Sequence, residues 1–491
     1  MHQLSLLLFL PVFGAILIAV LPSSASGLVR KVAIIFSSTA LLLSWSLFFS
    51  FDNSFAGMQF IEQYPWNPRL GTSFSLAIDG LSLPMILLAT LLCLVAIIAS
   101  TSIKQQPKSY YLLMLLLESA MLGVFMAQDW TLFYLFWELT LIPLFFLIDR
   151  WGGEKRHNAS LNFFLYTMGG SVFMLLSILL LFDASVEHSF AMSDIADSAT
   201  ALDADTQILI FLGLLIGFGV KMPIFPIHAW LPLAHVQAPS PVSILLSGIL
   251  LKMGSYGLIK AALTLPGAVL ALQDELAALA LFSMLYGGLL AWKQTDLKRM
   301  IAYSSISHMG VVLLGIAALN EAGISGAIMQ MVAHGLVAGA LFLLVGLLYE
   351  RTHTREISHY SSLIRITPKF ALFIILASMA AFGLPGTVGF IAEFHILIGG
   401  FEQWGWMIVV LSLGVLISAT YSIRTVTRLF TGPVQKDMFK IKDLRKTETV
   451  LASVLIISIF YLGFFPAELI SLISTSVTEI SNTFLSHQNT Q

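Results

Sequence analysis

The chain has 491 residues, of which 57% are hydrophobic and only 11% are charged, and its formal net charge is −2. Soluble domains carry about 25% charged residues, so this composition predicts a membrane protein, and the near-neutral charge gives no sign of binding to nucleic acid. The single cysteine, Cys93, excludes a disulfide framework and iron–sulfur clusters held by cysteines of this chain alone. Any redox chemistry is therefore expected in another subunit.

Apolar segments of membrane-spanning length recur along the whole chain. They fall at residues 3–21, 32–50, 80–100, 111–127, 130–148, 161–182, 207–232, 241–262, 276–292, 302–319, 324–348, 370–398, 405–423 and 450–470. The first of them precedes small residues, as in a signal peptide, but it lacks a basic n-region and is as long as a membrane span. We interpret it as the first helix. The sequence thus predicts an all-α polytopic membrane protein with about 14 transmembrane helices.

Basic residues concentrate in the odd-numbered connections between these helices. The sixth connection, by contrast, carries acids and no Lys or Arg: Glu187, Asp194, Asp197, Asp203 and Asp205. The positive-inside rule then places the odd-numbered connections in the cytoplasm or its equivalent. Both termini are expected on the opposite, lumenal or periplasmic, side.

Three charged residues lie inside the apolar helices instead of in connections: Glu138, Lys221 and Lys252 on the fifth, seventh and eighth helices. A charge near the bilayer centre costs about 3 kcal/mol, and such residues usually mark a pathway for ions or protons. Lysine, unlike arginine, can release its proton inside a protein. We interpret Glu138 and Lys221 as a switch pair in which the lysine balances the glutamate. The alternatives are a structural bond to a neighbouring helix for Glu138, a side chain that snorkels to the interface for Lys221 and a structural role for Lys252.

Helix breakers occur at matching places in the two halves of the chain. Pro223 and Pro226 follow Lys221 directly, and Pro385 interrupts the twelfth helix shortly before Glu393. Broken helices at membrane depth line cavities, and a matched pair of them predicts an internal repeat with its binding sites. The sequence therefore predicts breaks in helices 7 and 12.

The same symmetry predicts how the chain is divided. We expect helices 1–3 in residues 1–105, a first repeat of helices 4–8 in 106–265, a second repeat of helices 9–13 in 266–430, and a loop with helix 14 in 431–491.

Histidines supply further titratable groups near neutral pH. His308 on the tenth helix and His334 on the eleventh suit a proton relay between the two half-sites, and their alternative is a bond within a helix interface. A b-type haem between them is disfavoured, because di-haem cytochromes carry paired histidines on each of two helices. His228 and His235 lie beyond the break in the seventh helix and are interpreted as facing a cytoplasm-side water path. A metal site there lacks a third ligand, so neither a metal nor a cofactor is predicted in this chain.

Six motifs now stand in fixed order: DWTLFYLFWELTLIP, GVKMPIFPIHAWLPLAHVQAP, SGILLKMGSYGLIK, DLKRMIAYSSISHMG, MVAHGLVAGALFLLVGLLYER and FGLPGTVGFIAEF. Over residues 75–430 they resemble the antiporter-like chain 4, or M-type, subunits of type-1 NAD(P)H:quinone oxidoreductases, the family of respiratory complex I and its photosynthetic relatives. The resemblance implies two inverted five-helix repeats and a proton-translocating role in the membrane arm. By motif position, the family's axis of site residues corresponds to Glu138, Lys221, Lys252, His308, His334 and, as the exit-side acid, Glu393.

The resemblance also implies which cofactors and substrates are bound by other subunits and which partners this chain has. Quinone, iron–sulfur clusters and NAD(P)H or ferredoxin would be bound by partner subunits, and the direct partners would be other antiporter-like subunits, small membrane subunits and lipids. The membrane would be energy-transducing, either a cyanobacterial thylakoid or a bacterial plasma membrane. The alternative is a subunit of an Mrp-type cation/proton antiporter or of a membrane-bound hydrogenase. A structural subunit that has lost pumping is disfavoured, because the whole charged axis is present.

The chain departs from the family pattern after the seventh helix. The family often reads LPDAHxEAP there, whereas this chain reads LPLAHVQAP, with Leu233 and Gln237 at two acidic positions. The stretch WGGEKRHNASLNFFLYTMGGSVFML resembles the cyanobacterial and chloroplast branch more than the mitochondrial one. Within that branch, divergent paralogues serve complexes specialised for CO2 uptake, and the departures are compatible with such a paralogue.

Overall fold

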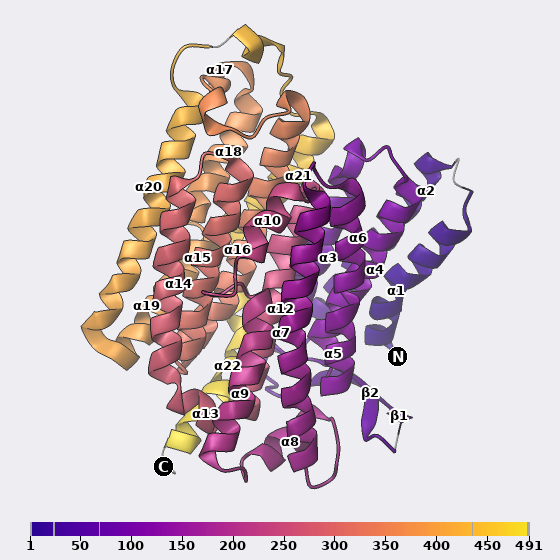
Figure 1. Ribbon diagram of the computed structural model, residues 1–491, viewed down its shortest axis with the longest axis vertical. Coiled ribbons are helices and arrows are strands. Elements are labelled where there is room, and N and C mark those ends of the chain that lie inside the picture. Colours follow the sequence, from indigo (N-terminus) through magenta and orange to yellow (C-terminus); the bar gives the residue numbers. More distant parts are fainter. Residues whose placement is uncertain (1, 23–24, 68, 435, 489–491) are drawn as a thin grey trace.

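A computed structural model describes residues 2–22, 25–67, 69–434 and 436–488. Figure 1 shows a bundle of helices that run roughly along its long axis, with both chain ends toward the end of the bundle that carries β1, β2 and α8. The spanning elements are α1 (Gln3–Val20), α2 (Ser26–Ser50), α3 (Ser82–Ala99), α4 (Pro107–Met126), α5 (Trp130–Leu139) with α6 (Leu141–Trp151), α7 (Arg156–Ala184), α9 (Ala204–Lys221) with α10 (Trp230–Gln237), α11 (Ser240–Leu245) with α12 (Leu251–Thr264), α14 (Gln273–Lys293), α15 (Leu297–Ala317), α16 (Glu321–Thr352), α18 (Pro368–Ala381) with α19 (Val388–Trp404), α20 (Val410–Phe430) and α21 (Lys446–Phe464).

The predicted transmembrane architecture is confirmed. Among the described residues, 13 helices are long and apolar enough to cross a membrane. The remaining crossing is the twelfth, where α18 and α19 are each too short alone but together span the bundle. Shorter elements cap the two ends of the bundle: α8 (Met192–Ala199), α13 (Pro266–Ala271) and α17 (Leu363–Ile366).

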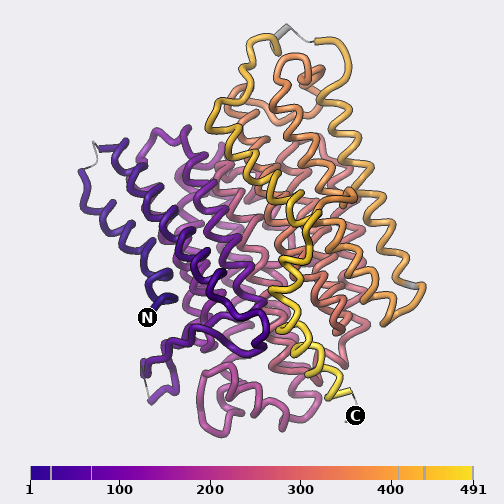
Figure 2. Tube along the Cα trace, turned by 180° about the vertical axis from the view of Figure 1, so that it is seen from behind, coloured from indigo at the N-terminus to yellow at the C-terminus, as the bar shows by residue number. Residues whose placement is uncertain are grey.

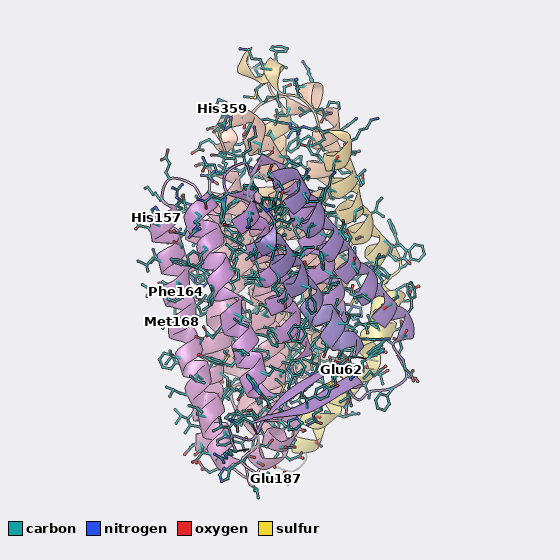
Figure 3. All side chains as sticks on the ribbon, turned by 90° about the vertical axis from the view of Figure 1, so that its right-hand side faces the viewer. Glu62, His157, Phe164, Met168, Glu187 and His359 are labelled. Atoms are coloured by element: carbon teal, nitrogen blue, oxygen red, sulfur yellow. The ribbon has the colours of Figure 1, made fainter. Side chains whose placement is uncertain are left out.

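The helices differ in how much of their apolar surface is covered. In α16 and in the α11–α12 helix, the whole of the most apolar stretch is buried, so these two helices form the centre of the molecule. On α7, by contrast, Phe164 and Met168 point outward between His157 near one end and Glu187 in the loop at the other (Figure 3). An apolar belt flanked by polar ends is the pattern of a surface that faces lipid.

Two elements lie outside the predicted all-α scheme. Residues 51–79, expected only as a connection, contain an antiparallel hairpin of β1 (Gln59–Asn67) and β2 (Thr72–Ile78). A further helix, α22 (Ala467–Gln488), follows the last span. Figure 2 shows α21 and α22 crossing the back of the bundle between the N-terminal helices and the second half. One face of α22 buries Leu472, Ile473 and Val477, which makes it an amphipathic helix.

The predicted breaks in helices 7 and 12 are both present. Turn residues separate α9 from α10 around Pro223 and Pro226, and α18 from α19 around Pro385. Helix 5 is interrupted as well, at Thr140 between α5 and α6. The reason lies in Pro143, which has no N–H to donate to the carbonyl four residues earlier. The eighth helix carries a π-helical segment, Leu246–Leu250, between α11 and α12.

A buried ion pair ties the start of α3 to the end of α12. The Lys260 ammonium donates to the Asp79 carboxylate at 2.8 Å, and Asp79 also accepts from the backbone N–H of Leu81 and of Ser82. Burial alone would raise the pKa of Asp79, but the charge of Lys260 and these hydrogen bonds hold the pKa below its usual range. The sequence places Lys260 merely at the end of a helix, so this pair becomes visible only in the fold.

We expect Lys260→Met to lower the free energy of unfolding by about 3–5 kcal/mol, because it leaves the Asp79 carboxylate buried without a cation. The measurement is thermal unfolding of the purified protein in detergent. As the matched control, Asp79→Asn combined with Lys260→Met should recover most of the loss. Equal destabilisation by the single and the double variant would contradict the role of the charge pair.

Candidate functional site

The first group of predicted site residues lies where α5 and α9 end. Lys221 is the last residue of α9 and is 1% exposed. Its ammonium donates to the Thr140 hydroxyl at 2.7 Å and to the Trp137 carbonyl at 3.4 Å, and it lies 4.1 Å from the centre of the Trp137 ring. The interruption of helix 5 therefore provides the acceptors that hold this cation.

Glu138 lies on the same turn of α5, close to the predicted partner Lys221 but without a direct ion pair between them in the described part of the chain. No N···O contact within 4.0 Å joins the two charges among the described side chains, and the Glu138 Oε1 atom is buried without a hydrogen-bond partner. The two charges nevertheless attract one another. We call Glu138, Thr140 and Lys221 the first cluster.

The second group is centred on Lys252, which is fully buried on α12. Its ammonium donates to the Ser247 carbonyl at 2.6 Å and contacts His334 Nδ1, also at 2.6 Å. Ser247 belongs to the π-helical segment, where the backbone departs from the regular α-helical pattern. Because an ammonium has only donors, His334 Nδ1 must accept when Lys252 is charged. When Lys252 carries the proton, the two side chains therefore share it across this contact.

His308 and Glu393 lie beyond the contact between Lys252 and His334. The rings of His308 and His334 lie 5.5 Å apart, and the His308 Nδ1 atom lies 3.9 Å from the Glu393 Oε1 atom. Gln330 approaches the same His308 nitrogen at 3.4 Å, and its Oε1 atom is buried without a partner. We call Lys252, His334, His308 and Glu393 the second cluster.

A small cavity lies within the second cluster. Its volume of about 20 Å³ is sufficient for one water molecule. Its walls are His308, Gln330, Ala333, His334, Val337, Ala380, Ala381, Gly389 and Glu393. Since its polar walls include both histidines and the glutamate, a water molecule here would reach the separated groups of the second cluster.

The break in helix 12 makes room for Glu393. Gly383 has a φ of +72°, which a residue with a side chain rarely adopts, and a Cβ atom there would lie 2.6 Å from the Glu393 Oε2 atom. A glycine is thus needed both for the turn and for the position of the carboxylate. The turn at Gly383 and the position of the Glu393 carboxylate therefore depend on each other.

Two further buried polar groups, His235 and Lys298, lie on α10 and at the start of α15. His235 is fully buried, stacks on Phe342 at 4.5 Å between ring centres, and has no hydrogen-bond partner for either ring nitrogen among the described residues. A positive charge on His235 would be repelled by both Lys298 and Lys252. Lys298, which the sequence assigns to a basic connection, is 3% exposed and donates to the Ala238 carbonyl at 2.7 Å. His228 lies apart and contacts Phe225 and Tyr286.

The chain is similar in sequence to a known family of membrane proteins. Residues 127–418 match the family described as "NADH:quinone oxidoreductase/Mrp antiporter, TM". The chain is 42% identical over 480 residues to NAD(P)H-quinone oxidoreductase chain 4 2 of Thermosynechococcus vestitus, covering 94% of this chain and 89% of that protein. It is 38% identical over 488 residues to NADH-quinone oxidoreductase subunit M of Rickettsia felis, covering 97% and 98% of the two chains. The chain belongs to this family.

Solved structures agree with the assignment to the NADH:quinone oxidoreductase/Mrp antiporter family. A chain of respiratory complex I from Thermus thermophilus matches with a TM-score of 0.90 and 31% identity, over 98% of this chain and 99% of that one. A chain of the Mrp complex from Dietzia, at 19% identity and a TM-score of 0.85, shares the fold. The resemblance to chain 4, or M-type, subunits that the motifs indicate is confirmed.

Within this family framework, the six predicted residues fall into the two clusters, and no contact joins Lys221 directly to Lys252 among the described side chains. Thr140, His235 and Lys298 are additional polar groups at these clusters that the sequence reading did not assign to the site. Pro143 was an available signal for Thr140, since it predicts a break one turn earlier. No three His, Cys, Asp or Glu side chains in the described part of the chain are arranged to hold a metal ion.

Proposed function

We propose that this chain is a proton-translocating membrane-arm subunit of an NAD(P)H or ferredoxin:quinone oxidoreductase. The observation that carries the proposal is the second cluster, in which the nitrogen atoms of a buried lysine and a buried histidine lie 2.6 Å apart, close enough to share a proton. Shared protons between buried groups of this kind suit transfer and do not suit a purely structural role. The chain 4 and subunit M relatives are named as parts of quinone oxidoreductases, which supports the assignment.

The first cluster would act as the electrostatic switch. Lys221 is held by a hydroxyl and a carbonyl, so its charge does not depend on a direct bond to Glu138. Glu138 acts across a short distance through an apolar interior, where charges interact more strongly than in water. Ionised Glu138 favours the charged form of Lys221, and neutral Glu138 removes that support. Protonation of Glu138 would thereby release a proton from Lys221 toward Lys252.

The second cluster would carry the proton onward. Lys252 passes its extra proton to His334, and the cavity between the rings connects His334 and His308 to Glu393. Glu393 lies on α19, which leads from the break in helix 12 toward the connection before α20. We infer that this connection and both termini face the lumen or periplasm, because the basic connections lie at the opposite end of the bundle. Glu393 would then be the exit-side acid.

The remaining parts of the machinery would belong to partner subunits. We propose that this chain carries no redox centre and that quinone, iron–sulfur clusters and NAD(P)H or ferredoxin are bound elsewhere in the complex. The two repeats, residues 106–265 and 266–430, would each contribute one broken helix to the axis. The membrane would be a thylakoid or a bacterial plasma membrane, as fits relatives such as those of Thermosynechococcus vestitus and Rickettsia felis.

Copurification tests the assignment of the complex. We expect this chain, tagged and solubilised gently, to bring down quinone-reductase subunits with iron–sulfur clusters, detected by mass spectrometry and by electron paramagnetic resonance. Recovery of a set of small antiporter subunits without iron–sulfur proteins would instead support an Mrp-type antiporter.

We expect Glu138→Gln to abolish or strongly reduce proton pumping while the complex still assembles, because glutamine cannot change its charge. Glu138→Asp should have a smaller effect, since it keeps the carboxylate. The measurement is proton uptake by sealed vesicles, followed with a fluorescent pH indicator, beside the quinone-reductase rate. Near-normal pumping by well-assembled Glu138→Gln complexes would contradict the proposed role of Glu138 as a switch.

We expect Thr140→Val to reduce pumping by about tenfold, because it removes the hydroxyl acceptor of Lys221 at nearly constant volume, and a hydrogen bond to a charged group contributes about 1.5–3 kcal/mol. Thr140→Ser is the matched control, since it keeps the hydroxyl and should retain most of the pumping. If valine and serine behave alike in the same vesicle assay, Thr140 does not hold the Lys221 charge.

A further inference from the structure

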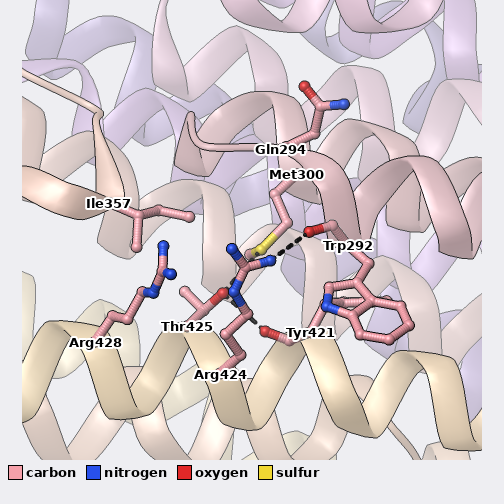
Figure 4. Close-up of a pocket in the computed structure, with 8 residues that line it drawn as sticks. All are labelled: Trp292, Gln294, Met300, Ile357, Tyr421, Arg424, Thr425 and Arg428. Atoms are coloured by element: carbon pink, nitrogen blue, oxygen red, sulfur yellow. Dashed lines mark hydrogen bonds between the residues drawn. The ribbon is translucent and has the colours of Figure 1, made fainter.

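A shallow pocket opens between α14, α15 and α20, at the end of the bundle that carries the basic connections (Figure 4). Its walls include Trp292 at the end of α14, Met300 of α15, and Tyr421, Arg424, Thr425 and Arg428 of α20. None of these residues belongs to the first or the second cluster. The pocket is therefore a feature that proton transfer along the axis does not explain.

The four α20 residues lie on one face of the helix because they are spaced by three, four and seven positions. Two of them fix this face to its neighbours. Arg424 donates to the Trp292 carbonyl at 2.8 Å, and the Thr425 hydroxyl contacts the Met300 sulfur at 3.1 Å (Figure 4). Arg428, one turn further along, has no hydrogen bond among those found between the described residues. One guanidinium is thus anchored at the pocket and a second lies beside it.

The charge of this arginine pair is not balanced by a carboxylate among the described side chains. Other arginines at the same end of the bundle do have such partners: Arg351 pairs with Glu448, and Arg355 pairs with Asp296. Two guanidinium groups one turn apart repel each other unless an anion lies between them. The pocket therefore has an excess of positive charge and of hydrogen-bond donors with the geometry that phosphate oxygens accept.

The surroundings indicate where such an anion comes from. Trp292 is 40% exposed, as is typical of an indole at a membrane–water interface. Toward the membrane interior, Leu413 and Ile417 lie eleven and seven positions before Arg424 on the same side of α20, and Leu413 is exposed, so an apolar surface continues from the arginine pair. A soluble anion would use only the arginines, whereas a lipid would use the arginines and the apolar surface together. Basic pockets between transmembrane helices on the cytoplasmic side bind lipid headgroups.

We propose that this pocket binds the headgroup of an anionic membrane lipid, with Arg424 and Arg428 on its acidic group and its acyl chain along Leu413 and Ile417. The occupant would bridge the ends of α14 and α20, which the hydrogen bond from Arg424 to the Trp292 carbonyl also joins. This role goes beyond proton translocation and does not depend on it.

The test uses the intact complex in phosphatidylcholine nanodiscs that contain a small share of phosphatidylglycerol. Retained lipids are counted by native mass spectrometry as detergent is added. We expect Arg424→Gln with Arg428→Gln to weaken phosphatidylglycerol retention by about fivefold per arginine, because each basic residue near a membrane surface contributes about that factor. Arg365→Gln is the matched control: it removes one exposed positive charge at the same end of the bundle, outside the pocket, and should retain the lipid.

Three results would overturn the proposal. The first is equal phosphatidylglycerol retention by the double variant and the Arg365→Gln control. The second is displacement of phosphatidylglycerol by inorganic phosphate alone, which would show a site for a soluble anion. The third is a cross-link from position 428 to a neighbouring subunit in place of lipid. If the double variant does not assemble, Arg428→Gln alone keeps the test informative, since Arg428 has no described hydrogen bond to lose.

Discussion

A lysine ammonium in an apolar interior must find its hydrogen-bond acceptors within the protein, and the irregular parts of this fold are arranged around that requirement. In a regular helix each carbonyl already accepts one backbone hydrogen bond, so it is a weaker acceptor for an ammonium than an oxygen at an irregular segment. Lys221 uses the carbonyl and hydroxyl oxygens at the interruption of helix 5, and Lys252 uses a carbonyl of the π-helical segment in helix 8. Each of these two lysines, neither of which has a carboxylate within ion-pair distance among the described side chains, thus coincides with an irregular part of a helix. The irregular parts are therefore part of the site and not deviations from it.

The two lysines meet this need for hydrogen-bond acceptors with different kinds of partner. Lys221 is bound by neutral oxygens and an aromatic ring, so its charge is stabilised without any change in a partner. Lys252 contacts a histidine, which can itself take up the proton. One lysine is suited to hold a proton until the field of Glu138 changes, and the other is suited to pass it on. The absence of a direct contact between Lys221 and Lys252 among the described side chains makes water or side-chain motion a necessary part of any transfer between them.

Sequence reading predicted the parts of this arrangement that depend on local chemistry. Membrane spans follow from apolar length, the breaks at Pro223 and Pro385 follow from the missing backbone donor, and intramembrane charges stand out because they are costly. The roles of the six site residues stay predictions that the geometry supports. The hairpin of β1 and β2 and the amphipathic α22 were missed because their residues are too polar for a span. The π-helical segment carries no Pro or Gly pattern that distinguishes it, and the burial of Lys298, His235 and Lys260 depends on helices distant in sequence.

The departures at Leu233 and Gln237 can be understood in the same physical terms. The Gln237 side chain accepts a hydrogen bond from the backbone of Lys155, so it holds the connection between α6 and α7 and does not face the clusters. Leu233 is 43% exposed. Between them His235 is fully buried, and a positive charge on it would be repelled by both Lys298 and Lys252. Replacing acids at the two flanking positions therefore removes no charge from the interior.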